Sequence, residues 1–217
     1  MNPRHLPQTD IYAVLSSAHS RGRPNIEVAR QLLEAGVKII QYREKALPMR
    51  QKYAECLAIR ELCRQHDACF IVNDDAGLAV AVGAGGLHLG QDDLPPAAAR
   101  KIIGEEIILG LSVTTPGEVD ETAGLSTIDY LGVGPIFDAT PTKPDAATPG
   151  GLALLDYCLS HSDLPVVAIG GIRLANVAEL TRRGAMCLAM VSDLVGAKDL
   201  KQRVSQIRDV IALAGSA

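Results

Sequence analysis

Residues 166–191, VVAIGGIRLANVAELTRRGAMCLAMV, contain a complete strand–helix–strand unit. The unit begins with the apolar run Val166–Ile169 and ends with the apolar run Cys187–Val191. Between them, apolar residues recur at helical spacing over Leu174–Leu180, and Gly184 ends the pattern. Because both runs are almost continuously apolar, each is typical of a parallel strand that is covered on both of its faces.

The same alternation of short apolar runs and helical patterns continues outward along the whole chain. The other expected strands are Ile11–Leu15, Val37–Tyr42, Cys69–Val72, Gly86–Leu89, Ile107–Leu111 and Tyr130–Val133. Eight such units in 217 residues give roughly 27 residues per unit, which suits a compact barrel. A doubly wound open sheet could hold the same alternation, but no G-x-G-x-x-G follows the first strand. We therefore predict an α/β fold, a (β/α)8 TIM barrel, as one domain over residues 1–217, with 1–9 as a flexible N-terminal extension.

The helical segments carry signals for where helices start and which side is buried. Asn25 is expected to cap the first helix, and Thr115 with Glu118 has the spacing of a capping box. A helix after Pro48 is expected to bury an apolar stripe, and a last helix should span roughly residues 199–213. The stripe consists of Met49, Tyr53, Cys56, Leu57 and Cys63.

Composition excludes several classes of function. The net charge of -4 gives no basic surface for nucleic acid or anionic lipid, and an aromatic content of 3% without tryptophan argues against a base-stacking platform. No apolar stretch has membrane-spanning length, and the first nine residues lack the apolar core of a signal peptide. The five cysteines form no metal-binding pattern. We expect free buried thiols and a cytoplasmic location; whether the chain forms a homo-oligomer stays open.

In a TIM barrel the chemistry sits just after each strand. Alternation after the second strand places Gln41, Arg43 and Lys45 on one face. Asn73 and Asp74 follow the third strand, and Asp93 follows the fourth. Taken one by one, such residues are explained equally well as helix caps or as ordinary solvated strand ends. Carboxylates at one rim can also hold Mg2+, which takes one or two protein carboxylates and leaves its other positions for water and substrate phosphate.

The later strand ends offer donors for phosphate groups. Hydroxyl groups, an ammonium group and the backbone N–H groups beside glycines can all donate to phosphate oxygens. The long connection Gly134–Gly150 is typical of a binding loop. His88, between two leucines of the fourth strand, is better explained as a satisfied core histidine than as a general base. The candidate donors are Ser112, Thr140, Thr142, Lys143, Gly171, Val191 and Ser192.

Taken together, these strand ends resemble the thiamine-phosphate synthase family over about Ile11–Asp199. Each motif is modest alone, but their order along the chain is specific. The motifs are QYREK (41–45), NDDAGLA (73–79), HLGQDDLP (88–95), GLSV (110–113), GVGPIF and TPTKPDA (132–146), AIGGI (168–172) and MVS (190–192).

The resemblance implies a reaction and a set of roles. An aminopyrimidine methyl pyrophosphate loses pyrophosphate, by a dissociative route through a pyrimidine methyl cation, and a thiazole phosphate nitrogen is alkylated to give thiamine phosphate. Asp74 and Asp93 would bind Mg2+. Gln41, Arg43, Lys45, Asn73, Ser112 and Lys143 would surround the pyrimidine pyrophosphate, with Arg43, Lys45, Ser112 and Lys143 as catalytic groups. Thr140, Thr142, Gly171, Val191 and Ser192 would hold the thiazole phosphate.

Two departures from the family pattern and two alternative functions accompany this interpretation. Gly85 stands where the family commonly has an acidic residue, and one extra residue near 138–139 shifts the register of the loop that carries Thr140 and Thr142. Asp75 and Asp92 are interpreted as caps or supporting residues.

A related thiazole tautomerase shares the barrel but expels no pyrophosphate, so it needs neither the paired aspartates nor the QxRxK strand. A non-catalytic sensor of a thiamine precursor is the other alternative.

Overall fold

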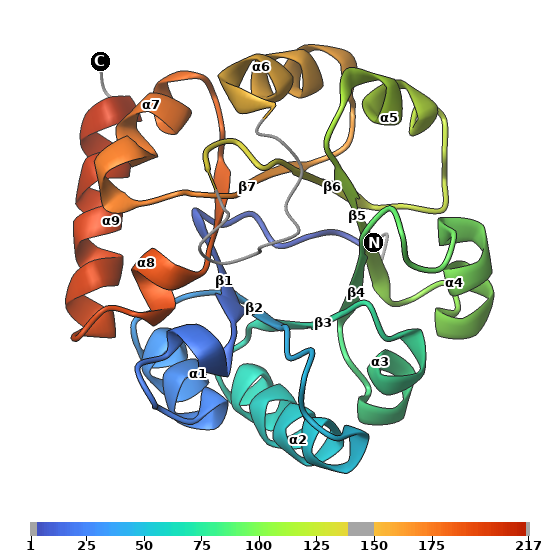
Figure 1. Cartoon of the computed structure of the whole chain (residues 1–217), viewed down its shortest axis with the longest axis vertical. Coiled ribbons are helices and arrows are strands. Elements are labelled where there is room, and N and C mark those ends of the chain that lie inside the picture. Colours follow the sequence, from blue (N-terminus) through green and yellow to red (C-terminus); the bar gives the residue numbers. More distant parts are fainter. Residues whose placement is uncertain (1–3, 139–149, 216–217) are drawn as a thin grey trace.

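A computed structural model describes residues 4–138 and 150–215, and within them eight parallel strands close into a barrel in sequence order (Figure 1). Each strand pairs with its two neighbours in the chain, and β1 closes the barrel against β8. The predicted TIM barrel is confirmed. The strands are β1 Ile11–Leu15, β2 Ile39–Tyr42, β3 Cys69–Asn73, β4 Gly86–Leu89, β5 Ile108–Val113, β6 Tyr130–Val133, β7 Val166–Ile169 and β8 Cys187–Met190.

Helices form the outer ring around the barrel (Figure 1). In the described part of the chain, none is long and apolar enough to cross a lipid bilayer. They are η1 Ser17–His19, α1 Asn25–Glu34, α2 Met49–Gln65, α3 Ala76–Val82, α4 Pro96–Ile103, α5 Pro116–Glu121, α6 Gly151–His161, η2 Leu174–Asn176, α7 Val177–Arg182, α8 Ser192–Val195 and α9 Leu200–Gly215.

Strand boundaries differ from the sequence prediction at three points that matter for the site. β3 includes Asn73, and β5 runs on to Val113, so that Ser112 belongs to the strand. β8 ends at Met190, which leaves Val191 in the turn before α8. The hydrogen bonds between neighbouring strands use only backbone groups, so polar residues can extend β3 and β5. Hydropathy detects only the apolar part of each strand.

Two predictions about the helices are wrong in detail. Asn25 is the first residue of α1 and Pro24 is the N-cap, because the Asn25 amide donates instead to Glu44 and Glu55. The apolar stripe of α2 is only partly buried. Cys56 and Cys63 are buried, together with Ile59, but Met49, Tyr53 and Leu57 are exposed. A helix 17 residues long on the outside of a barrel buries only the narrow side that meets the strands.

The capping predictions at α3 and α5 stand. The Asp75 side chain caps α3 by accepting from Leu78 N at 2.8 Å. Thr115 caps α5 by accepting from Glu118 N. The Glu118 carboxylate accepts from the backbone of Thr114 rather than from that of Thr115, so the reciprocal half of the box is displaced by one residue.

The hydrophobic core has two layers. The larger one lies between strands and helices, and the smaller one fills the barrel lumen with inward residues such as Val14, Ile39 and Ile71. Leu6 is buried in this lumen cluster, and Arg4 pairs with Asp129 just before β6. Figure 1 shows the first segment crossing the barrel. A flexible extension was expected here, but residues 4–9 pack against the barrel because Leu6 covers otherwise open apolar surface.

Candidate active site

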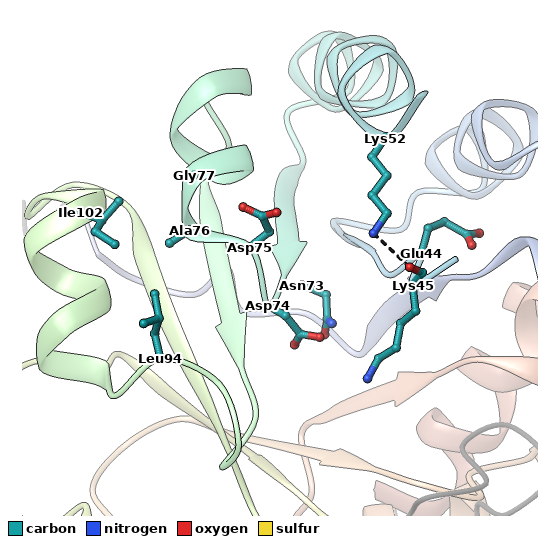
Figure 2. A pocket seen from close by; sticks show the side chains of 10 residues that line it. All are labelled: Glu44, Lys45, Lys52, Asn73, Asp74, Asp75, Ala76, Gly77, Leu94 and Ile102. Atoms are coloured by element: carbon teal, nitrogen blue, oxygen red, sulfur yellow. Dashed lines mark hydrogen bonds between the residues drawn. The ribbon is translucent and has the colours of Figure 1, made fainter. Parts of the chain in front are cut away.

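A cavity of about 460 Å³ opens beside the C-terminal ends of β2 and β3. Its lining includes Lys45, Asn73 and Asp74, which the sequence selected from two different strand ends. Figure 2 shows these three side chains extending in one direction, while Asp75 and Glu44, which also line the cavity, point in other directions. The structure therefore brings together residues that lie 28 or more positions apart in the chain, at the end of the barrel where enzymes of this fold carry their chemistry.

Asp74 and Asp93 form the centre of the site. Asp74 adopts a left-handed backbone conformation, with φ of 65°, which aspartate tolerates better than most residues. Its N–H donates to the His88 carbonyl in β4 at 2.8 Å, and its side chain hydrogen-bonds with Asp93. Asp93 also accepts from the Gly90 N–H at 2.7 Å. The turns after β3 and β4 thus fix two carboxyl groups in contact.

The contact between these carboxyl groups changes the acidity of Asp74. Burial, followed by the hydrogen bond and negative charge of Asp93, raises the pKa of Asp74 to about 6, while the positive charges of Lys45 and Arg43 act in the opposite direction. Two carboxylates side by side repel each other unless a proton or a cation lies between them. The pair is therefore suited to hold a cation.

The donor set fits a hard divalent cation of the Mg2+ type. The described residues contain no cluster of three or more histidine, cysteine or acidic side chains, as the nitrogen- and sulfur-rich sites of zinc require. Mg2+ needs fewer protein ligands, since it keeps water and takes substrate phosphate oxygens. Asp74 and Asp93 could supply the protein oxygens of such a site.

Hydrogen bonds from neighbouring elements hold the segment after β2 in place. The Glu44 carboxylate accepts from the backbone N–H of Ser17 and from the Asn25 amide. Glu55, on α2, accepts from Asn25 and from the Tyr42 hydroxyl, each at 3.0 Å. Glu44 is anchored by these donors, and the neighbouring cation Lys45 extends on the side of Asn73 and Asp74 (Figure 2). Sequence reasoning missed this support, because its members come from η1, α1, β2, the connection after β2, and α2.

Gln41 and Ser112 lie deeper, at the two ends of a polar chain inside the lumen. Gln41 is buried and donates to the Tyr12 hydroxyl at 2.8 Å. Ser112 lies 2.9 Å from His88 Nε2, and Tyr130 joins His88 to Tyr12. The prediction of a satisfied core histidine is confirmed. Tyr12 and Tyr130 were missed, although glycines at 110 and 132 inside strands signal close packing there.

The remaining predicted residues lie at the β7–β8 side or outside the described residues. Gly171, with φ of 63°, packs against the β6 loop, where a Cβ would lie 2.6 Å from the Asp138 carbonyl oxygen. Ser192 begins α8 directly after Val191. Asp92 is exposed beside the Asp93 turn. Thr140, Thr142 and Lys143 fall outside the described residues.

Fold and site together define an enzyme of the (β/α)8-barrel class with polar groups gathered at the C-terminal rim. Residues 11–194 match the family model described as thiamine monophosphate synthase, and the chain belongs to this family. It is 49% identical over 207 residues to the thiamine-phosphate synthase of Pelotomaculum thermopropionicum, covering 95% of this chain and 94% of that one. It is 43% identical to that of Lawsonia intracellularis, covering 94% of each chain.

A solved structure agrees with these relatives. The thiamine phosphate pyrophosphorylase from Pyrococcus furiosus superposes with a TM-score of 0.84, at 31% identity and covering 98% of each chain. The match extends over almost the whole barrel, so no separate domain accounts for it.

Proposed function

We propose that this protein is a Mg2+-dependent thiamine-phosphate synthase. Its substrates would be an aminopyrimidine methyl pyrophosphate and a thiazole phosphate. The C–O bond to pyrophosphate breaks, the C–N bond to the thiazole nitrogen forms, and pyrophosphate leaves with the bonding electrons. The names of the curated relatives support the reaction, and the carboxyl pair of Asp74 and Asp93 beside Lys45 is the observation that carries the proposal for this chain.

The chain's own residues have electrostatic tasks in this proposal. Negative charge grows on the departing pyrophosphate, and preorganised positive groups stabilise that charge. Arg43 and Lys45, with Lys143, would neutralise it, and Asn73 would orient the phosphate oxygens. When bound to Asp74 and Asp93, Mg2+ would supply further charge neutralisation at the pyrophosphate. No proton has to move in this reaction, so it needs no side-chain nucleophile activated by a base.

The thiazole phosphate is assigned to the opposite side of the rim. Gly171, Val191 and Ser192 would bind its phosphate through backbone N–H groups and the serine hydroxyl, together with Thr140 and Thr142. Phosphate binding after strands seven and eight is common in this fold. We place the reaction in the cytoplasm, which the five free cysteines support.

The test is direct. Purified protein is incubated with both substrates and Mg2+, and thiamine phosphate is measured, with a parallel reaction in excess chelator. We expect product only with the metal. Folded protein that gives no product, under conditions where a thiamine-phosphate synthase from one of the relatives works, would refute the proposal. Conversion between thiazole phosphate isomers would then indicate the tautomerase.

A further inference from the structure

Five side chains form an unbroken row of hydrogen bonds across the barrel lumen. Gln41 Nε2 lies 2.8 Å from Tyr12 Oη, and Tyr12 Oη lies 2.9 Å from Tyr130 Oη. Tyr130 Oη is 2.9 Å from His88 Nδ1, and His88 Nε2 is 2.9 Å from Ser112 Oγ. The row starts on β2, passes through β1, β6 and β4, and ends on β5. It therefore connects two predicted substrate contacts that sit on different sides of the barrel.

The middle of the row is rigid. Tyr12 and Tyr130 are 2% and 0% exposed, and the centroid of the Tyr130 ring lies 5.4 Å from that of His88. Gly110 and Gly132 leave space for these two rings, since a Cβ at either glycine would clash with them. Close packing of this kind holds side chains in single rotamers. The geometry of the row is thus set by the barrel and needs no ligand.

Counting protons gives the row a direction. The Gln41 amide donates to Tyr12, and the buried Tyr12 proton is then satisfied when Tyr12 donates to Tyr130. Tyr130 then gives its own proton to His88 Nδ1, which leaves the neutral imidazole with its proton on Nε2. Burial raises the pKa of both tyrosines well above its usual range, so both keep their protons at neutral pH.

The two ends of the row now have fixed and opposite roles. In the arrangement that this proton count gives, His88 Nε2–H donates to Ser112 Oγ, which leaves the serine proton for a ligand. At the other end the Gln41 carbonyl oxygen is available as an acceptor, because the amide NH2 faces Tyr12. An aminopyrimidine carries the complementary pair, an exocyclic N–H donor and ring-nitrogen acceptors.

We propose that Tyr12, Tyr130 and His88 are positioning residues that fix the carbonyl of Gln41 as acceptor and the hydroxyl of Ser112 as donor for an aminopyrimidine ring. The proposal rests on the proposed function and extends it to residues that do not touch the substrate. Without the row, the Gln41 amide and the Ser112 hydroxyl could each rotate. Binding the pyrimidine would then have to order both groups.

Steady-state kinetics of Tyr130→Phe tests the proposal. The substitution keeps the ring but removes the hydroxyl between Tyr12 and His88. We expect KM for the pyrimidine pyrophosphate to rise about tenfold, with KM for the thiazole phosphate changed by less than about twofold. Tyr157→Phe is the control, since it removes a tyrosine hydroxyl that donates to Asp120 between the outer helices α6 and α5, away from the lumen. Its KM values should stay near those of the wild type.

A second measurement does not depend on turnover. A long-range 1H–15N correlation spectrum of the wild type should show His88 as the Nε2–H tautomer, and Tyr130→Phe should weaken that preference. An Nδ1–H tautomer in the wild type would overturn the proposal. If Tyr130→Phe does not fold, Tyr12→Phe interrupts the same row and carries the same kinetic expectation.

The outcomes separate this inference from the proposed function. Wild-type turnover with unchanged KM for the pyrimidine pyrophosphate in the folded variant overturns the inference and leaves the synthase standing. Absence of wild-type turnover overturns the synthase, and the tautomer spectrum then tests the direction of the row by itself.

Discussion

The ring of Tyr130 occupies the space beside Gly110, where a Cβ would lie 2.1 Å from the tyrosine Cζ. The two residues are register partners on β5 and β6. Gly132, the next residue but one after Tyr130, has the same relation to His88, whose Cε1 would lie 2.8 Å from a Cβ there. The two glycines therefore create the room for the polar row inside the lumen.

Gly110→Ala should destabilise the protein by about 1–3 kcal/mol, because the added methyl group overpacks a closed core. The Tyr130 ring is fully buried and has no free space into which to move. Denaturant unfolding followed by circular dichroism would measure the loss.

The control for this change is Gly117→Ala. Gly117 lies in α5 with nothing within 4 Å of a built Cβ, so alanine there should be neutral or stabilise by up to about 1 kcal/mol. Equal stability losses at both positions would contradict the packing argument.

Hydropathy was enough to predict the barrel because each parallel strand is covered on both sides. Runs such as Val166–Ile169 carry this signal within four residues. The hydropathy signal is misleading where only one side of a helix is buried, or where a residue outside the strands and helices packs into the core. Met49 and Leu57 looked like core residues but are exposed on α2, and Leu6 looked like part of a tail but is buried in the lumen.

The site could be predicted where its residues directly follow strands. Asp74 follows β3 and Asp93 lies in the turn after β4, and the barrel brings consecutive strand ends together. Tyr12 and Tyr130 were not predicted to belong to the site, because the sequence pattern of an aromatic residue in an apolar strand is the same as that of any core residue. Their hydrogen bonds depend on which inward side chains meet across the lumen, and that follows from strand tilt and register rather than from local sequence.

Asp93→Asn should lower the rate of thiamine phosphate formation by roughly 100-fold or more, the usual scale for losing a charge-stabilising group. The substitution keeps the size of the side chain but removes one of the two adjacent negative charges. The initial rate is measured against Mg2+ concentration, where we expect the midpoint to move upward.

Asp92→Asn is the matched control, because Asp92 is exposed and carries the same charge one position away. Its rate should stay close to that of the wild type. An unchanged rate for Asp93→Asn at limiting Mg2+ would remove Asp93 from the ligand set.

The thiols of the native protein should be unreactive at neutral pH. Burial raises the pKa of Cys56, Cys63, Cys69 and Cys187 to about 12 and that of Cys158 to about 11. Since the thiolate is the reactive form, labelling with a disulfide reagent should be negligible before unfolding and should reach all five cysteines in denaturant. Prompt labelling of the folded protein would show that a thiol is open to solvent.

The ion pair of Asp10 and Arg208 should make stability depend on pH in the acid range. Arg208 Nε lies 2.8 Å from Asp10 Oδ2, and the guanidinium also donates to the carbonyls of Ala35 and Gly36. Burial alone raises the pKa of Asp10, but the hydrogen bond and charge of Arg208, with backbone N–H donors, outweigh burial and hold the pKa below its ordinary value of 3.8.

A carboxyl group whose pKa is lowered in the folded state stabilises the fold above its unfolded pKa, and this contribution is lost as the pH falls through the folded pKa. Asp10→Asn should therefore cost about 1–3 kcal/mol at neutral pH, and the difference from the wild type should shrink as the pH falls below about 4. Asp209→Asn removes an exposed carboxylate next to Arg208 on α9 and should cost little at any pH. Urea unfolding at a series of pH values measures both variants, and a cost for Asp10→Asn that stays constant from neutral pH to pH about 2 would show that the charge of Asp10 contributes nothing to stability.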